Sequence, residues 1–403
     1  MDPQITNSHA GSDPYQYTPL DENKEEIRLL ALLPGQFSSE IRVCLDVARF
    51  TKDHTPTFEA VSYTWGSSEN PVDIFIGNSD NKTLSITQNL AEALPYLRFE
   101  DKPRVLWIDA ICVDQQNLGE RGHQVKRMAD IYSRAARVLI WLGPEAQDSS
   151  RALSCLEHVA SKVWYDWNLQ ELSATTEELH WADKNAEIPL AEEDWIAIYH
   201  LINRPWFERL WIRQEVQLAS EDPALMCGHH TTSWMSLCHA VACIWAKPKR
   251  YFSKEYGQPI EGPLRIIRTL CDSRRGDVLR GLITSTKHCV CSDPRDKIYS
   301  LLSLASKQTV CEIEPDYTKS VHEVYRDAVL STIRTTKFHN LDILTTVEAG
   351  ADRAKVSSWV PDVCPVFHIQ HSKSLETSNV PRLLITRWSD DLGLVFHQEY
   401  NCH

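Results

Sequence analysis

The chain has 403 residues, enough for two or three core-forming units, which excludes a single small module. Its 42 Lys and Arg side chains against 55 Asp and Glu give a formal net charge of -13, which argues against nucleic acid as a partner. The chain has no apolar run near the roughly 18 residues that cross a bilayer, no signal segment, and 12 cysteines without a repeating framework. We therefore expect a cytoplasmic protein without a membrane span.

The N-terminal part predicts a tail followed by hairpins. Residues 1–24 are polar and predict a disordered tail. Short segments that favour strands follow, bounded by turn-forming residues, at 26–33, 40–50, 58–66, 72–78 and 82–87. We expect the first two to pair as one hairpin and the last two as an edge hairpin, with a helix over 88–99 behind them.

The block Arg104–Gly143 predicts a strand, a polar loop, a helix and a second strand. Both flanking runs, VLWIDAIC and RVLIWLG, are nearly continuous in apolar residues, as in strands covered on both faces of a parallel sheet. In such sheets ligands lie beyond the carboxyl ends of strands. Polar side chains gather there after the first strand, at Asp109, Asp114, Gln115 and Glu120.

The second half changes from alternating strands and helices to a mainly helical pattern. After a helix from Asp148, an acidic, irregular insertion spans about 165–193; a helix then begins at Pro205 with Asn203 as its N-cap, followed by a strand at 224–228 and a helix at 234–245. The chain is therefore predicted to be α/β, with one domain at 25–245 and a mainly helical C-terminal region at 246–403.

Several familiar sites are missing from the sequence. It contains no GxGxxG, no GxxxxGK[ST] and no GxSxG, which removes the usual dinucleotide-fold, P-loop and hydrolase interpretations. Soft ligands group at Cys227, His229 and His230 and again at His288, Cys289 and Cys291, but neither group has paired CxxC spacing. We expect these groups to be structural and predict no metal.

Three carboxylates have both a functional and a structural interpretation. Asp109 lies in an apolar run, where it needs a partner such as Arg121 or Arg127, a loop to cap, or a cleft to face. Glu120 opens a helix, where the helix dipole alone would favour it. Glu215 follows Trp211 by four residues at the rim of an apolar stripe, with Gln214 nearer its middle. Two such polar groups need a ligand, a water or an ion pair with a neighbouring arginine.

Four blocks resemble the fungal heterokaryon-incompatibility (HET) domain, and they occur in family order: VSYTWG at 61–66, LWIDAICVDQ at 106–115, the run from Glu120 to Gly143, and RPWFERLWIRQEVQLA at 204–219. Three later segments, SDPRDKIYSLLSLA, EPDYTKSVHEVY and SSWVPD, are similar to those that usually follow that domain. The resemblance covers about 35–365.

The resemblance implies a role in fungal non-self recognition and programmed cell death, a form of innate immunity. It also implies a fold similar to Toll/interleukin-1 receptor domains, a small and mostly parallel sheet with helices on both faces. In that superfamily, members that cleave NAD carry a glutamate four residues after a tryptophan on the helix that follows the third strand. The matching pair here is Trp211 and Glu215.

Two functional hypotheses follow from the resemblance. In the first, the protein hydrolyses NAD at the nicotinamide–ribose bond, with NAD as substrate and no cofactor; Glu215 is catalytic, Arg121 or Arg213 meets the pyrophosphate, and the pocket is lined by Ser62, Tyr63, Trp65, Gly66, Asp109 and Trp211. In the second, it is a non-enzymatic death-signalling module that works by self-association as a homo-oligomer. Either form is expected to respond to a protein partner that triggers it.

Overall fold

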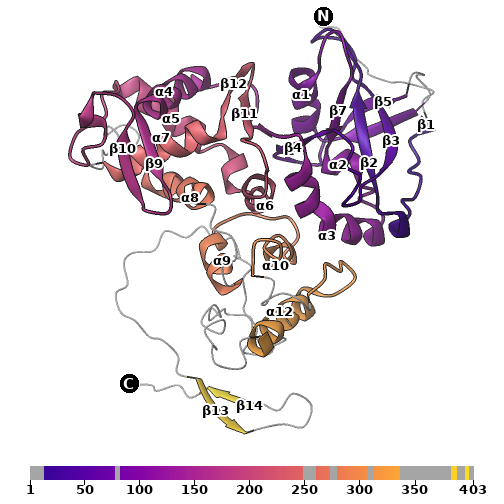
Figure 1. Ribbon diagram of the computed structural model, residues 1–403. Coiled ribbons are helices and arrows are strands. Elements are labelled where there is room, and N and C mark those ends of the chain that lie inside the picture. Colours follow the sequence, from indigo (N-terminus) through magenta and orange to yellow (C-terminus); the bar gives the residue numbers. More distant parts are fainter. Residues whose placement is uncertain are drawn as a thin grey trace, which may run out of the picture.

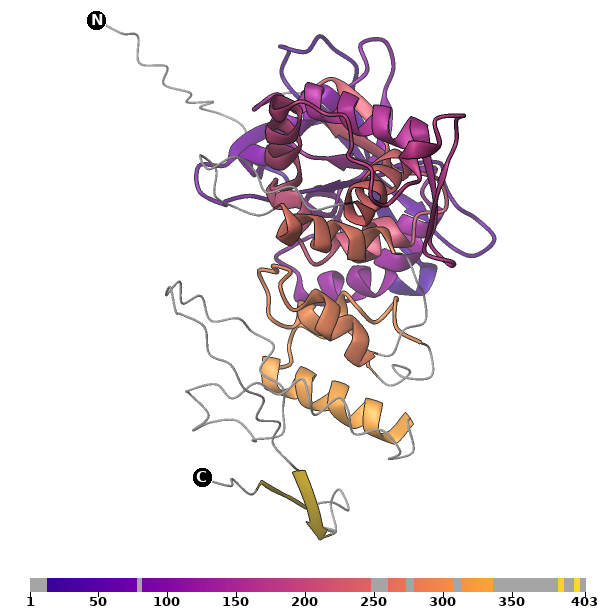
Figure 2. The same ribbon diagram turned by 90° about the vertical axis from the view of Figure 1, so that its left-hand side faces the viewer.

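The structure, a computed structural model, describes residues 13–77, 82–247, 260–272, 279–306 and 313–335, and the backbone of strands at 383–387 and 395–398. Its main part is a mixed sheet with helices, and the orange helices of the C-terminal region lie below it in both Figure 1 and Figure 2. The predicted α/β class with a helical C-terminal region is confirmed. Within the described residues, no helix is both long and apolar enough to cross a membrane.

The centre of the sheet consists of four parallel strands in the spatial order β7, β4, β8, β11. Their bounds are Arg104–Trp107, Glu59–Tyr63, Arg137–Trp141 and Ala224–Cys227. β4, β8 and β11 are short, apolar and buried over most of their length, as a covered parallel sheet requires, whereas Val105 of β7 is exposed. The chain goes from β4 to β7 on one side and then to β8 on the other. Ligands of such sheets lie where the strand order reverses in this way, here beside β4.

Two hairpins, together with β1 and β12 at the edges, extend this centre into a sheet of ten strands in the described residues, larger than the small sheet expected. The predicted hairpins are confirmed as β2 with β3 (Glu26–Leu32, Arg42–Arg49) and β5 with β6 (Val72–Ile76, Lys82–Ile86). β2 joins β7, and β3 joins β5, so both belong to the central sheet. At the other edge β12 (His230–Ser233) runs antiparallel to β11.

Residues 13–24, which the sequence placed in the tail, contact the folded protein. β1 (Asp13–Pro14) pairs with β6, and a 3-10 turn, η1 (Glu22–Lys24), precedes β2. The hydroxyl of Tyr17 donates to the carbonyl of Ile111 at 3.0 Å. The tail prediction is therefore wrong for this part, because polar composition does not reveal such long-range bonds.

The helices of the main part follow the predicted positions with three differences. The run VLWIDAIC is a strand only to Trp107, and α2 begins at Asp109. The insertion contains a hairpin, β9 with β10, and ends in a helix, α5, whose C-cap is Asn203. The helix predicted from Pro205 is two pieces, η3 and α6, so Asn203 is not its N-cap.

These elements have the following bounds: α1 Gln88–Leu97, α2 Asp109–Cys112, α3 Leu118–Arg134, α4 Ser149–Lys162, β9 Val163–Asp166, β10 Glu171–Ala174, η2 Leu179–Trp181, α5 Glu192–Ile202, η3 Pro205–Glu208, α6 Ile212–Gln217 and α7 Trp234–Ala246. α3 begins where the Asn117 side chain accepts hydrogen bonds from the amides of Gly119 and Glu120.

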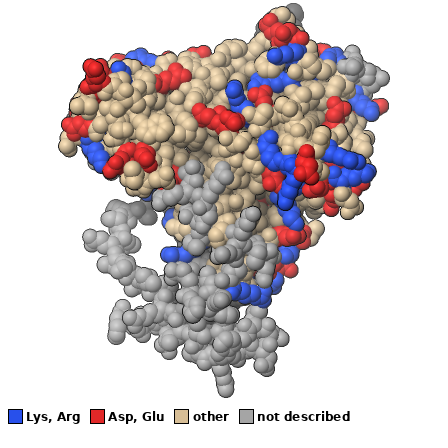
Figure 3. All heavy atoms as spheres, in the orientation of Figure 1, with Lys and Arg blue, Asp and Glu red and all other residues tan. Residues whose placement is uncertain are grey.

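The C-terminal region contains α8 (Glu261–Cys271), α9 (Leu279–Thr286), α10 (Asp296–Tyr299) and α12 (Val321–Thr335), and a separate hairpin of β13 (Leu383–Arg387) and β14 (Val395–Gln398). α8 belongs to the main core, whereas α9, α10 and α12 form a second apolar cluster with Leu210 and Leu218. The SSWVPD segment lies outside the described residues. Figure 3 shows both signs of charge interspersed on one face of the described part.

Candidate functional site

The carboxyl ends of β4 and β7 place two side chains together. Trp65 follows β4, and Asp109 follows β7; because these strands are parallel neighbours, both residues emerge at the same sheet edge. The indole Nε1 of Trp65 donates to Oδ2 of Asp109 at 2.9 Å, and the amide of Ala110 donates to Oδ1 at 2.8 Å. Gly66 has φ +74°, and a Cβ there would meet the Asn89 side chain at 2.7 Å, so the turn after β4 requires glycine.

The facing wall comes from the C-terminal region. The amide of Val290 donates to the carbonyl of Glu208 at 2.7 Å, and the amide of Leu210 donates to the carbonyl of Val290 at 3.0 Å. This pairing fixes the chain that leads to α10, where Asp296 accepts hydrogen bonds from Trp211 Nε1 at 3.0 Å and from the Tyr317 hydroxyl at 2.7 Å.

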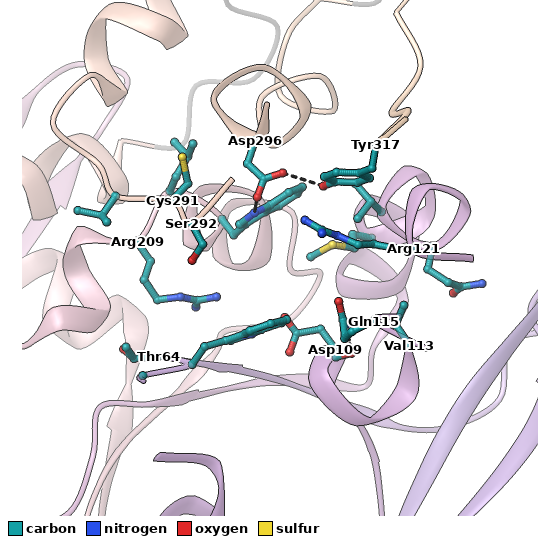
Figure 4. A pocket seen from close by; sticks show the side chains of 18 of the residues that line it. Thr64, Asp109, Val113, Gln115, Arg121, Arg209, Cys291, Ser292, Asp296 and Tyr317 are labelled. Carbon is teal, nitrogen blue, oxygen red and sulfur yellow. Dashed lines mark hydrogen bonds between the residues drawn. The ribbon is translucent and has the colours of Figure 1, made fainter. Parts of the chain in front are cut away.

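Between these walls lies a cavity of about 350 Å³, at the small end of ligand pockets. In Figure 4 Asp109 and Gln115 lie on one wall and Asp296 and Tyr317 on the other, with Arg209 and Arg121 reaching in from opposite sides. Trp65 and Trp211 add large aromatic surfaces to the lining. The cavity thus combines flat apolar walls, two guanidinium groups and carboxylates.

The two aspartates share an electrostatic environment that disfavours their charge. Burial, with a further contribution from the charge of Glu215, raises the pKa of Asp109 to about 6. Burial also raises the pKa of Asp296 to about 6, although hydrogen bonds from Tyr317 and Trp211 oppose it. Both carboxyls therefore titrate close to neutral pH, as groups at functional sites often do.

Glu215 lies behind the Arg209 side of the cavity and does not line it. The carboxylate is only 1% exposed and forms an ion pair with Arg209 through two contacts of 3.3 Å. It also accepts a hydrogen bond from Ser62, whose hydroxyl in turn accepts one from Trp206 Nε1 at 2.9 Å. Burial disfavours the Arg209 cation, but the charges of Glu215 and Asp109 outweigh this and raise the pKa of Arg209.

The structure separates the predicted site residues into two groups. Trp65, Gly66, Asp109 and Trp211 line the cavity, as does Arg121. Ser62, Tyr63 and Glu215 are buried beside it, and burial and the nearby Asp109 raise the pKa of Tyr63 well above its usual value. Arg213 does not reach the cavity: it donates to Thr269 at 2.7 Å and lines a second hollow of about 160 Å³.

The other weighed residues have structural partners. Glu120 pairs with buried Arg28 at 2.8 Å and accepts from the amide of Asp114, so it holds the loop before α3. Gln214 is buried, and its Oε1 has no hydrogen-bond partner in the described residues. The two Cys/His groups do not assemble, since no cluster of three or more potential metal ligands occurs in the described part of the chain.

The cavity residues that were not singled out from the sequence include Arg209, Asp296 and Tyr317. Asp296 and Tyr317 belong to segments similar to those that follow the HET domain, so the sequence marked these two segments. It did not show that they lie opposite the ends of β4 and β7. Arg209 was missed because the sequence predicts one continuous helix from Pro205. In that helix it would lie six residues from Glu215 and roughly 120° away from it around the helix axis, too far for a contact between neighbours on one face.

The comparisons with known proteins agree on one family. The family described as "Heterokaryon incompatibility protein (HET)" matches residues 58–215. Heterokaryon incompatibility protein 6, OR allele, of Neurospora crassa is 29% identical over 356 residues, which cover 76% of this chain and 51% of that protein. The chain therefore spans about half the length of this curated relative.

No solved structure matches the chain, so the similarity to Toll/interleukin-1 receptor domains stays a prediction. The family match begins just before β4 and ends at Glu215, and it contains the whole β4, β7 and α3 side of the cavity. The ordered motifs, the matched segment and the relative lead to the same conclusion. Residues 58–215 are similar to the fungal HET domain, and most of the chain is similar to the Neurospora incompatibility protein.

Proposed function

We propose that this chain acts as a HET-type effector of fungal incompatibility, and that its cavity binds NAD and hydrolyses the nicotinamide–ribose bond, so that loss of NAD causes cell death. The observation that carries the proposal is the cavity at the carboxyl ends of β4 and β7, where Asp109 faces aromatic walls and two arginines. Its volume suits the nicotinamide riboside half of a dinucleotide, with the remainder outside.

The lining offers a group for each part of that substrate. Cleavage develops positive charge on the ribose, which an adjacent carboxylate stabilises. Asp109 and Glu208 are the carboxylates of the matched segment that line the cavity; Asp109 follows the carboxyl end of β7 and bonds to Trp65, so we assign this role to it. Arg121 is suited to a phosphate, because its guanidinium provides paired donors. The indole faces of Trp65 and Trp211 are suited to stacking.

The predicted catalytic residue, Glu215, receives a different role in this proposal. Its carboxylate is committed to Arg209 and Ser62, so it positions Arg209 at the cavity instead of contacting ribose. The resemblance to Toll/interleukin-1 receptor domains favours Glu215 as the catalytic group, which makes the two assignments competing hypotheses with opposite outcomes for single substitutions.

The test is to incubate purified protein with NAD and to measure released nicotinamide for wild type, Asp109→Asn and Glu215→Gln. We expect Asp109→Asn to lower the rate by about 100-fold or more, the scale of losing an electrostatic stabiliser, and Glu215→Gln to have a smaller effect. A Glu215→Gln variant without activity beside an active Asp109→Asn variant would return the catalytic role to Glu215.

The alternative is a non-enzymatic module that signals by self-association. The burial of Glu215 in an ion pair favours it, as do large apolar side chains exposed around the β9–β10 hairpin: Trp164 is 54% exposed, Leu169 68% and Leu179 75%. Light scattering of wild type and Leu169→Asp would detect such assembly. Absence of nicotinamide release in every oligomeric state would decide for this alternative.

A further inference from the structure

A second carboxylate enters the cavity from outside the family match. Asp296 begins α10, some eighty residues after the match ends at Glu215, and its side chain is 94% buried by the surrounding structure. It nevertheless lines the same cavity as Asp109, from the opposite wall in Figure 4. The site therefore has two acidic walls, one from the HET domain and one from the C-terminal region.

Within the described residues, the carboxylates of Asp109 and Asp296 accept hydrogen bonds from uncharged donors only. Asp109 accepts from Trp65 Nε1 and the Ala110 amide, and Asp296 accepts from Trp211 Nε1 and the Tyr317 hydroxyl. Among the described residues neither forms an ion pair: of the two arginines in the lining, Arg209 pairs with Glu215, and Arg121 lies over the Tyr317 ring at 3.8 Å and contacts Asp293 at 3.5 Å.

Buried carboxylates without an ion partner are costly, and their cost falls when a cation comes between them. The rest of the lining also favours a cation of a particular shape. Trp65 and Trp211 present aromatic surfaces, which attract flat or alkylated cations that have little hydration to lose. A small inorganic cation would not use these surfaces.

We infer that the cavity selects a ligand with a positively charged aromatic ring, and that Asp296 is a specificity-determining residue that senses this charge. The choice of ring rests on the proposed function: in NAD the oxidised nicotinamide is a cationic pyridinium, whereas reduced nicotinamide is neutral. The HET domain alone supplies one of the two carboxylates, so full charge selection requires the C-terminal region.

The test compares two probes of nearly equal shape, 1-methylnicotinamide, a cation, and nicotinamide, which is neutral. Their affinities for the full-length protein are measured at pH 8 by ligand-observed NMR titration. We expect the wild type to bind the cation about tenfold more tightly, a ratio in the range of a desolvated cation–π contact. Asp296→Asn should reduce this ratio toward one.

Asp316→Asn is the matched control, because Asp316 lies in the same region outside the cavity and its carboxylate accepts hydrogen bonds from Thr318 alone among the described residues. It should keep the wild-type ratio. Equal affinities of the wild type for both probes, or an unchanged ratio in Asp296→Asn, would overturn the inference.

If Asp296→Asn does not fold, the pH profile of the wild-type ratio decides. The ratio should fall as pH drops through about 6, where both carboxyls take up protons; a flat profile between pH 5 and 8 would refute the inference. The charged and titratable groups that face them are Glu215, Arg209, Tyr63, Tyr132 and Cys112 for Asp109, and Asp293, Arg121 and Tyr317 for Asp296; Glu208 and Cys291 also line the cavity.

The experiments distinguish failure of the proposed NAD hydrolysis from failure of the proposed charge selection. Preference for the cation without any release of nicotinamide from NAD keeps the charge selection and removes the hydrolase. Release of nicotinamide from NAD without a preference between the probes keeps the hydrolase and removes the charge selection.

Discussion

At the residue scale, the stability of the fold should depend most strongly on the buried ion pair between Arg209 and Glu215. Replacing Arg209 by Met leaves Glu215 buried without its partner, and we expect the free energy of unfolding to fall by about 3–5 kcal/mol. The double variant Arg209→Met/Glu215→Met removes both charges and should recover most of this loss. Urea unfolding of the wild type, Arg209→Met, Glu215→Met and the double variant measures the coupling; losses that simply add would show that the pair is not coupled.

The ionised carboxylate of Asp296 should lower the free energy of unfolding at neutral pH. Its pKa is raised to about 6 in the folded protein from 3.8, so the folded state holds the proton more tightly and loses stability as pH rises from about 4 to 6. Asp296→Asn keeps a side chain of the same shape without this penalty. We expect it to be more stable than wild type by up to ~3 kcal/mol at pH 8 and by little at pH 4.

The control for this pH dependence is again Asp316→Asn. The Thr318 side-chain and backbone hydrogen bonds lower the pKa of Asp316, so its ionised form is favoured in the folded state and the substitution should lose stability relative to wild type as pH rises. Unfolding curves at several pH values compare the two slopes. Slopes of the same sign would contradict the stated environments of these two carboxyls.

At the residue scale, a site residue could be predicted from the sequence where its position follows from local structure. Asp109 could be assigned to the site because ligands lie beyond the carboxyl ends of parallel strands, a rule that needs no long-range information, whereas Trp65 and Gly66 were assigned through the family resemblance. Glu215 could be recognised as a polar group in a buried face, but its partner could not be chosen. Arg209 reaches it only because the backbone between them leaves the helix.

At the element scale, the break between η3 and α6 is imposed by another part of the chain. A helix through Leu210 would send its amide to a carbonyl one turn earlier, whereas here that amide donates to Val290. The sequence from Pro205 has an unbroken helical pattern, so no local signal predicts the break. The hairpins β2–β3 and β5–β6 were predictable because their pairing is local, but their place in the central sheet was not.

This pairing can be tested at Val290, whose side chain is 47% exposed while its amide donates to Glu208. Val290→Pro removes the donor and should lower the free energy of unfolding by about 1–3 kcal/mol and weaken ligand binding, because the wall that leads to Asp296 loses its anchor. Val290→Ala keeps the amide and should behave like wild type. An equal loss in both variants, measured by urea unfolding, would show that the side chain is responsible instead.

At the scale of the whole molecule, the cavity depends on docking of the C-terminal region onto α3. Figures 1 and 2 place α9, α10 and α12 beneath the main part, and the contacts at the junction involve one α3 residue in particular. Arg121 lies over the Tyr317 ring and contacts Asp293. The alternation of strands and helices predicted both regions, but nothing in either pattern encodes how they face each other.

Arg121→Ala should loosen this docking without unfolding the sheet. Loss of the cation–π contact and of the weak ion pair is expected to raise amide hydrogen exchange over residues 289–306 by roughly tenfold, while exchange in β4 and β8 stays unchanged. Arg134→Ala is the control on the same helix, since Arg134 lies over Phe50 at 4.3 Å within the main part. It should leave 289–306 as in wild type. Unchanged exchange at 289–306 in Arg121→Ala would mean that the apolar cluster around Leu210 and Leu218 holds the region in place without the arginine.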